Sequence, residues 1–243
     1  MLKGSQGDSD GLEVPMKVSF LIPAYNEART IAELIERVSA LPLEKELIVV
    51  DDGSTDDTPA ILARLRQGRD DLIVIRQANA GKGAALRAGI PRITGDIVVI
   101  QDADLEYDPA EVESLIEPIV RGLADVVYGS RLSGGKPQRA YLFWHMIGNR
   151  FLSLVTGMLF NTTLSDMETG YKAFRADVLK SLDLRANDFT IEPEITAKIC
   201  KLRLRIYEVP ISYYGRSYDE GKKITWRDGF KALWMLARVR VGS

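Results

Sequence analysis

Four short runs of apolar residues, separated by segments with helical spacing, constrain the fold of this chain more than any other feature. The runs cover residues 18–22, 47–50, 72–75 and 96–100. They are short, and they lack the apolar–polar alternation of a sheet with one wet face, which indicates strands buried on both faces. The regular exchange of strand and helix predicts βαβ units. We therefore expect an α/β fold with a mostly parallel central sheet flanked by helices.

Three of these runs end in polar clusters. Pro-Ala-Tyr-Asn-Glu occupies residues 23–27, Asp-Asp-Gly-Ser-Thr-Asp occupies residues 51–56, and Asp-Ala-Asp occupies residues 102–104. The carboxyl ends of parallel strands meet at one edge of a sheet, and ligands bind there. We therefore expect the three clusters to share one site. A carboxylate of the second cluster could accept a hydrogen bond from a ribose, although the same residues also suit a simple turn.

Asp102 and Asp104 are candidate metal ligands. They stand two residues apart after a strand, so in extended backbone both carboxylates lie on the same side. Such a pair is repulsive unless a cation relieves it, and oxygen ligands favour Mg²⁺ or Mn²⁺. Glu106 is a further candidate ligand, although pairs of this kind also occur in acidic loops that bind no metal. The triplet at residues 81–83, Gly-Lys-Gly, lacks the spacing of a P-loop but could still approach a phosphate closely.

The counts of cysteine and histidine exclude several classes of site. Cys200 is the only cysteine and His145 the only histidine, so an internal disulfide is impossible and a Cys/His zinc cluster is not expected. A Ser-His-Asp hydrolase would depend on His145, which lies among apolar neighbours. No run of 18 apolar residues occurs, so no membrane-spanning helix is predicted. Residues 1–15 are polar and are expected to form a loose tail rather than a signal peptide.

Charge is distributed unevenly along the chain. The formal net charge is −2, yet residues 196–243 hold 11 basic and 4 acidic side chains. A basic carboxyl-terminal portion suits an anionic partner, or it is simply a solvated basic face. Residues 140–165 carry one formal charge, Arg150, which leaves a core helix and a membrane-surface element both open.

An amphipathic helix is expected over residues 226–243. Its apolar residues fall on one stripe, and basic residues lie off that stripe: Trp226, Phe230, Leu233, Trp234, Ala237 and Val241 against Arg227, Lys231, Arg238 and Arg240. This pattern is typical of a helix lying on an anionic membrane. The alternative is a last helix that packs its stripe against the domain.

The order of the motifs is more specific than any one of them. The three polar clusters and the Gly-Lys-Gly triplet are joined by Gly-Ser-Arg at residues 129–131. This set resembles the family 2 glycosyltransferases of the GT-A fold, over about residues 17–230. Within that family it is most similar to the polyprenyl-phosphate glycosyltransferases, such as the dolichyl-phosphate mannose and glucose synthases. Residues 165–175 and 208–211 also look like that subgroup.

The resemblance implies a catalytic domain over residues 16–225 with a nucleotide site at the strand ends. The nucleotide-binding positions would be Pro23, Tyr25, Asn26, Glu27, Val50, Asp52, Gly81, Lys82, Asp102 and Ala103. Asp102 and Asp104 would hold the metal and the diphosphate, with Glu106 where relatives often carry glutamine. The cofactor implied is Mg²⁺ or Mn²⁺.

The resemblance also implies a catalytic set, made of Asp104, Arg131, Asp166, Arg216 and Lys222. The two arginines and Lys222 match the basic positions that meet the diphosphate and the acceptor phosphate, and Lys223 could replace Lys222. Asp166 stands where the family places a base or an orienting carboxylate. Its alternative is a structural loop carboxylate paired with Lys172 or Arg175.

Together these expectations describe an inverting, metal-dependent transferase that moves a hexose from a nucleotide sugar to a polyprenyl phosphate. The acceptor phosphate is already ionised, so positioning should matter more than deprotonation. The triplet at residues 170–172 looks more like the UDP-sugar branch of the family than the mannose branch, and this resemblance implies a UDP-hexose such as UDP-glucose, with GDP-mannose as the alternative. A glycan or protein acceptor, which would need a carboxylate base of raised pKa, and a non-catalytic regulator that binds nucleotide sugar remain open.

The expected surroundings follow from the same resemblance. The protein would lie peripherally on the cytoplasmic face of a membrane, with a membrane-protein partner as a further possibility. A nucleic-acid partner is not expected, because the basic segment contains no recognised reading motif.

Overall fold

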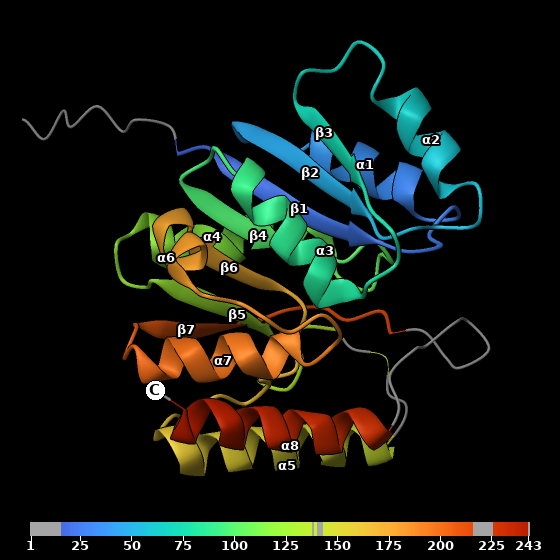
Figure 1. Cartoon of the computed structure of the whole chain (residues 1–243). Helices are drawn as coiled ribbons and strands as arrows, with labels where there is room; N and C mark the ends of the chain where they lie inside the picture. Colours follow the sequence, from blue (N-terminus) through green and yellow to red (C-terminus); the bar gives the residue numbers. More distant parts are fainter. Residues whose placement is uncertain (1–15, 138, 140–142, 216–225, 243) are drawn as a thin grey trace, which may run out of the picture.

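The computed structural model describes residues 16–137, 139, 143–215 and 226–242. Seven strands form one sheet in the order β3-β2-β1-β4-β6-β5-β7 (Figure 1). Their bounds are β1 (Val18–Ala24), β2 (Lys45–Asp51), β3 (Leu72–Arg76), β4 (Ile97–Ile100), β5 (Val126–Ser130), β6 (Lys172–Arg175) and β7 (Ile206–Pro210). The four predicted strands are β1 to β4, and their pairings are parallel. The predicted α/β class is confirmed.

Strand β6 is the one antiparallel member of the sheet within the described residues, pairing with β4 and β5 in that sense. Lys172, at its amino end, lies opposite Ile100 of β4 and Tyr128 of β5. The loop that enters β6 therefore reaches the edge where the parallel strands end. This reversal places residues 165–171 beside the predicted site.

Helices cover both faces of the sheet. They are α1 (Ile31–Ser39), α2 (Thr58–Leu65), α3 (Lys82–Gly89), α4 (Val112–Val120), α5 (Phe143–Phe160), α6 (Ala176–Ser181), α7 (Ile191–Lys201) and α8 (Trp226–Val241), with 3₁₀ turns at Ile90–Arg92 and Pro109–Glu111. One core joins the sheet to α1, α2 and α4, and a second joins it to α3, α6 and α7. Successive residues of β1 divide between the two cores, because side chains alternate along a strand.

Helices α5 and α8 form a further layer that lies against α7 and away from the sheet (Figure 1). Leu152 of α5, Ala197 of α7 and Leu236 of α8 are buried together in this third cluster. No helix within the described ranges is both long enough and apolar enough to cross a membrane.

The stripe predicted for the last helix lies mainly on the outside. Phe230, Trp234 and Val241 are exposed, whereas Ala232 and Met235 of the opposite face are buried. The alternative in which this stripe packs against the domain is therefore wrong for these three residues. Leu233 is half-buried, Ala237 is exposed, and the side chain of Trp226 lies outside the described part.

Candidate functional site

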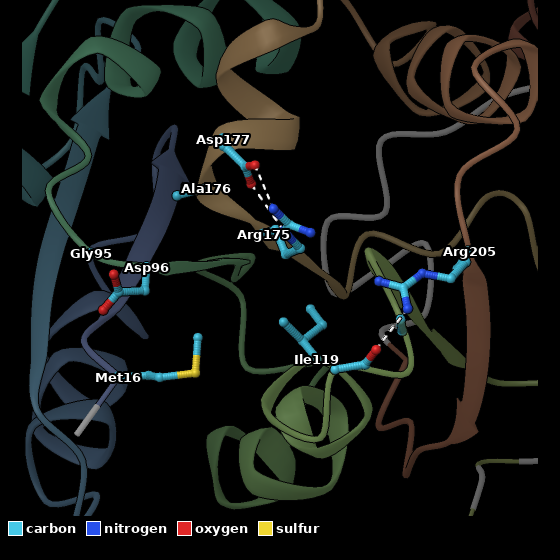
Figure 2. A pocket seen from close by; sticks show the side chains of 10 residues that line it. Met16, Gly95, Asp96, Ile119, Arg175, Ala176, Asp177 and Arg205 are labelled. Carbon is cyan, nitrogen blue, oxygen red and sulfur yellow. Dashed lines mark hydrogen bonds and ion pairs between the residues drawn. The ribbon is translucent and has the colours of Figure 1, made fainter. Parts of the chain in front are cut away.

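One pocket lies away from the predicted site. It measures about 450 Å³, and Figure 2 shows Asp96, Arg175 and Arg205 among its lining residues. These residues flank the amino ends of the parallel strands, which is the edge opposite the polar clusters. Both cations are already ion-paired, Arg175 with Asp177 at 2.6 Å and Arg205 with Asp125 at 2.7 Å.

The first two polar clusters meet at the other edge, as predicted. The backbone N–H of Asn26 donates to Ser54 Oγ at 2.9 Å, and Thr55 N–H donates to Asn26 Oδ1 at 2.8 Å. Asn26 has a φ of 56°, a left-handed conformation that asparagine tolerates better than most residues. Glu27 is buried, and its N–H donates to Thr58 Oγ1 at 2.9 Å. The end of β1 is therefore fixed to the loop that follows β2.

Asp52 organises the loop that carries the Gly-Lys-Gly triplet. Its carboxylate accepts hydrogen bonds from Gln77 Nε2 at 2.7 Å, Ala80 N–H at 2.9 Å and Gly81 N–H at 2.8 Å. Gly81 has a φ of 101°, and a Cβ there would lie 2.4 Å from a backbone oxygen of Asn187, so only glycine fits. The predicted positions Pro23 and Val50 flank this region in β1 and β2, Val50 fully buried.

A buried charge network surrounds the triplet lysine. Lys82 Nζ lies 2.7 Å from Asp102 Oδ1 and 3.0 Å from Glu192 Oε1 of α7, while Lys172 of β6 also pairs with Glu192. Burial lowers the pKa of Lys82, but the charges of Asp102 and Glu192 outweigh it and raise that pKa above its ordinary value. The network therefore keeps a fixed positive charge where a diphosphate is expected.

The three predicted metal ligands are close in sequence, and each makes a different contact. Asp102 is bound by Lys82, Asp104 Oδ1 accepts Glu106 N–H at 3.1 Å, and Glu106 Oε2 accepts from Tyr213 Oη at 2.7 Å. Within the described residues no three acidic, histidine or cysteine side chains form a complete cation site. Mg²⁺ is often bound by one or two carboxylates, with substrate phosphates as further ligands. The donor set of Asp102 and Asp104 fits a metal bound together with a diphosphate.

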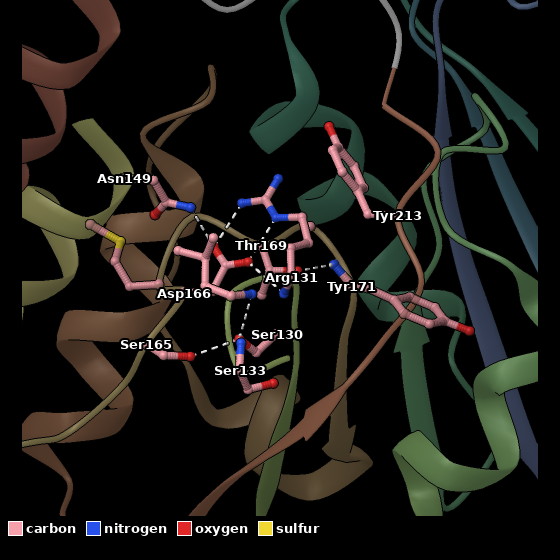
Figure 3. Close-up of polar contacts among 12 residues, drawn as sticks. Ser130, Arg131, Ser133, Asn149, Ser165, Asp166, Thr169, Tyr171 and Tyr213 are labelled. Atoms are coloured by element: carbon pink, nitrogen blue, oxygen red, sulfur yellow. Dashed lines mark hydrogen bonds and ion pairs between the residues drawn. The ribbon is translucent and has the colours of Figure 1, made fainter. Parts of the chain in front are cut away.

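The second half of the site is built on Arg131 and Asp166. Figure 3 shows the side chains of Arg131 and Asn149 directed at Asp166. Arg131 donates to Asp166 from Nε and Nη2, both at 2.7 Å, and from its backbone N–H at 2.9 Å. Asn149 Nδ2 adds a fourth bond at 2.7 Å. Asp166 is fully buried, and the alternative pairing with Lys172 or Arg175 is wrong.

These contacts fix the charge states of both groups. Burial by itself raises the pKa of Asp166, but the charge and hydrogen bonds of Arg131 outweigh it and lower the pKa. The pKa of Arg131 is raised, because Asp166 outweighs its burial. Asp166 is therefore an ionised carboxylate whose two oxygens already accept four hydrogen bonds. It holds a guanidinium in place, and it is poorly suited to accept a proton.

Glu208 explains the motif at residues 208–211. It accepts hydrogen bonds from the backbone N–H of Ser165 at 2.9 Å and of Asp166 at 3.2 Å. Ser165 Oγ in turn bonds Ser130 Oγ at 2.7 Å (Figure 3). The acid at the middle of β7 therefore anchors the loop that presents Asp166 to Arg131.

Tyr107 and Gly170 join the two halves. Tyr107 Oη accepts the N–H of Gly170 at 3.0 Å and lies 3.5 Å from Arg131 Nη1. A Cβ at Gly170 would lie 2.3 Å from Asp102 Oδ2 and 3.0 Å from Lys82 Nζ. The contacts around Arg131 and those around Asp102 therefore lie on either side of Gly170, a position that tolerates no side chain.

Sequence reasoning missed several residues of this site. Tyr107, Asn149, Glu168, Glu192 and Tyr213 carried no chemical motif, although Glu168 stands inside the segment that carried the resemblance. The ring of Tyr213 lies under the Arg131 guanidinium at 5.1 Å. The predicted residues Arg216 and Lys222, with the alternative Lys223, lie outside the described residues.

Comparisons with known proteins identify the family of this chain. The family model described as Glycosyl transferase family 2 matches residues 19–183. The chain is 30% identical to the dodecaprenyl-phosphate galacturonate synthase of Rhizobium johnstonii, over 89% of this chain and 64% of that protein. It is 31% identical to the undecaprenyl-phosphate mannosyltransferase of Micrococcus luteus, over 93% of this chain and 100% of that protein. The chain thus spans less than two thirds of the first relative and the whole of the second.

A solved structure shares the fold. Glucosyl-3-phosphoglycerate synthase from Mycobacterium tuberculosis, crystallised with Mn²⁺, uridine diphosphate and phosphoglyceric acid, superposes with a TM-score of 0.72 at 22% identity. The match covers 93% of this chain and 79% of that chain. The predicted GT-A fold is thereby confirmed.

Proposed function

Because this chain belongs to glycosyl transferase family 2, we propose that it moves a hexose from a nucleotide sugar to a polyprenyl phosphate with inversion at the anomeric carbon. The observation that carries this proposal is the adjacency of two fixed cations at one edge of the sheet. Lys82 lies beside Asp102, where the leaving diphosphate is expected, and Arg131 lies across Gly170, where an acceptor phosphate would bind. Preorganised charges of this kind stabilise a transferring group without rearrangement.

The state of Asp166 favours a phosphate as the acceptor. A sugar or protein hydroxyl needs a base to remove its proton, whereas a phosphate is ionised at neutral pH. Asp166, the carboxylate that the sequence placed in that role, is occupied by Arg131 and Asn149. A hydroxyl acceptor would have to rely on Glu168 instead, whose carboxyl has a pKa raised to about 7 by burial. The named activities of both curated relatives also involve a prenyl phosphate.

The metal would act at Asp102 and Asp104. When bound there, Mg²⁺ or Mn²⁺ would supply positive charge to the diphosphate as it leaves. The chain's own contribution is Lys82, whose ammonium is held by Glu192 as well as by Asp102. Asp104→Ala should abolish metal-dependent binding of nucleotide. If metal still strengthens nucleotide binding by the variant as it does for the unmodified protein, the assignment is contradicted.

The outer surface of α5 and α8 supports a lipid acceptor. We define the apolar face as the exposed apolar residues of both helices: Phe143, Trp144, Ile147, Phe151, Leu154 and Met158 of α5, with Phe230, Trp234 and Val241 of α8. Trp144 is 79% exposed and Met158 is 70% exposed, and extended surfaces of this kind mark interaction sites. On its inner side the same α5 presents Asn149 to Asp166. A lipid lying along this face would bring its phosphate toward Arg131.

The donor is proposed as a UDP-hexose such as UDP-glucose, with GDP-mannose as the alternative. The test is a transfer assay with Mg²⁺ or Mn²⁺, in which radiolabelled UDP-glucose, UDP-galacturonate and GDP-mannose are each offered with a short polyprenyl phosphate in detergent. Labelled lipid from one donor is the expected result. Label on a glycan acceptor but never on the lipid would replace this proposal with the glycan alternative, and binding of the donor without any transfer would support the regulator.

A further inference from the structure

Glu168 lies between the two halves of the site. It stands midway along the loop whose residue Asp166 is bound to Arg131 and whose residue Gly170 adjoins Asp102. The antiparallel direction of β6 carries this loop to the edge where β4 and β5 end. Glu168 therefore lies on the loop between Lys82, where the diphosphate is expected, and Arg131, where the acceptor phosphate is expected.

Glu168 differs from the other carboxylates around it. Asp102, Asp166 and Glu192 are each bound by a lysine or an arginine. The side chain of Glu168 is only partly exposed, and its buried Oε1 has no hydrogen-bond partner within the described part of the chain. A buried carboxyl oxygen without a partner is costly, so such groups in native proteins call for an explanation.

The charges that act on Glu168 come from both halves of the site. Burial raises the pKa of its carboxyl to about 7, the charge of Glu192 adds to this rise, and Lys172 and Arg131 oppose it. Glu192 and Lys172 belong to the network of Lys82, whereas Arg131 belongs to the other half. This electrostatic position agrees with the place of Glu168 along the loop.

We propose that Glu168 binds the hexose of the donor, by accepting a hydrogen bond from one of its hydroxyl groups. The inference rests on the proposed function, in which the anomeric carbon passes from the leaving diphosphate to the acceptor phosphate. The hexose must then lie between Asp102 and Arg131, which is where Glu168 stands. In its ionised form the carboxylate accepts a charge-assisted hydrogen bond, so this contact discriminates between sugars with and without the hydroxyl.

The test compares a nucleotide sugar with its nucleoside diphosphate. Isothermal titration with Mg²⁺ measures UDP-glucose against UDP, and GDP-mannose against GDP, on the full chain and on Glu168→Ala and Glu168→Gln. Glu168→Ala should weaken the nucleotide sugar that the protein prefers by about 10- to 100-fold, with the diphosphate unchanged within about twofold. Glu168→Gln keeps an acceptor oxygen and should lose less. Glu113→Gln, an exposed glutamate of α4, is the matched control.

Four results would overturn the inference. Equal weakening of nucleotide sugar and diphosphate would make Glu168 a structural residue. Unchanged affinity for the sugar, or no preference of the unmodified protein for either nucleotide sugar over its diphosphate, would remove the contact. A loss of kcat at unchanged donor affinity would assign it to proton transfer. If the unmodified protein labels no lipid in the transfer assay, the proposed acceptor fails while this comparison of affinities still stands.

Discussion

Asp166 shows what a single residue position can and cannot reveal from sequence. Its place in the motif indicated a base or an orienting carboxylate, and both remained open because hydrogen-bond partners are not written in the sequence. In the structure Asp166 accepts four hydrogen bonds from Arg131 and Asn149, 35 and 17 residues away, and these contacts favour an orienting role. Asn149 carried no signal of its own, because an asparagine inside an apolar helix is ordinary.

Asp166→Asn tests this role. Loss of the charge frees Arg131 from its bidentate contact, so transfer should fall by about 100-fold with a raised KM for the acceptor. The affinity for the nucleotide sugar should stay within about twofold. The pH profile of kcat separates orientation from proton transfer: orientation predicts the same shape at a lower level. Disappearance of an acid limb in the variant would instead make Asp166 a base. Thermal unfolding of the variant checks that the fold around the half-buried Arg131 is intact.

Glu168 offers a prediction on stability. The pKa of its carboxyl is about 7 in the folded protein against an ordinary 4.5, so the folded state binds more protons between these values. Stability attributable to this group therefore falls as the pH rises from 4.5 to 7 and stays low above 7. Glu168→Gln should stabilise the protein at pH 8 by about 1–2 kcal/mol, after allowance for partial exposure. The gain should shrink as the pH falls toward 4.5.

Thermal unfolding at pH 8, 7 and 5 measures this effect. The substitution should raise Tm by about 2–6 °C at pH 8, with a smaller rise at each lower pH. A rise that is the same at all three values would show that packing, not ionisation, is responsible. Glu113→Gln again serves as the control, and it should leave Tm unchanged throughout.

At the scale of elements, apolar runs located β1 to β4 but not β6. Strand β6 contains two charged residues in four, Lys172 and Arg175, so its sequence lacks the pattern of a buried strand. Lys172 is fully buried only because Glu192 of α7 neutralises it, and that pairing is a property of the fold. The reversal of direction at β6, which brings Glu168 to the site, was therefore beyond reach of local patterns.

Glu46 of β2 stabilises the opposite edge of the sheet. Burial by itself would raise the pKa of its carboxyl, but hydrogen bonds from Ser19 of β1, from Thr94 before β4 and from Lys17 outweigh this and lower it to about 2. Because the folded pKa lies below the ordinary 4.5, the stabilisation is present above pH 4.5 and is lost as the pH falls toward 2.

Glu46→Gln should therefore cost about 2–3 kcal/mol at neutral pH. Urea unfolding at pH 7 measures the loss, with Glu33→Gln, an exposed glutamate of α1, as the control. Transfer per folded molecule should not change, because Glu46 lies at the edge away from the site. Equal stability of the two variants at pH 7 would mean that the hydrogen bonds to Glu46 contribute nothing net.

At the scale of the molecule, the order of strands and helices predicted that the three polar clusters lie at one edge of the sheet. This prediction was possible because βαβ connections make the strands parallel. The amphipathic pattern also identified the outward stripe of α8. The pattern did not reveal that α5 lies beside α8, since that arrangement depends on the small cluster around Leu152, Ala197 and Leu236. Two modest stripes thereby become one apolar face.

This apolar face predicts binding to an anionic bilayer. The same two helices carry exposed basic residues, Arg150 on α5 and Lys231, Arg238 and Arg240 on α8. Basic residues on such helices favour anionic lipid headgroups as the apolar residues enter the interface. Each large apolar side chain that leaves water contributes about 1.5–3 kcal/mol. Trp234→Glu should therefore weaken binding to phosphatidylglycerol vesicles by at least tenfold, and raised salt should weaken the unmodified protein.

Vesicle sedimentation measures this prediction, and Val120→Glu, which changes an exposed apolar residue of α4, is the matched control. The control should bind vesicles as the unmodified protein does. Trp234→Glu should keep the unmodified Tm, because Trp234 is 58% exposed while the buried face of α8 is unaltered. Undiminished vesicle binding by Trp234→Glu would remove α8 from the membrane contact, whereas equal loss in both variants would leave charge alone as the cause.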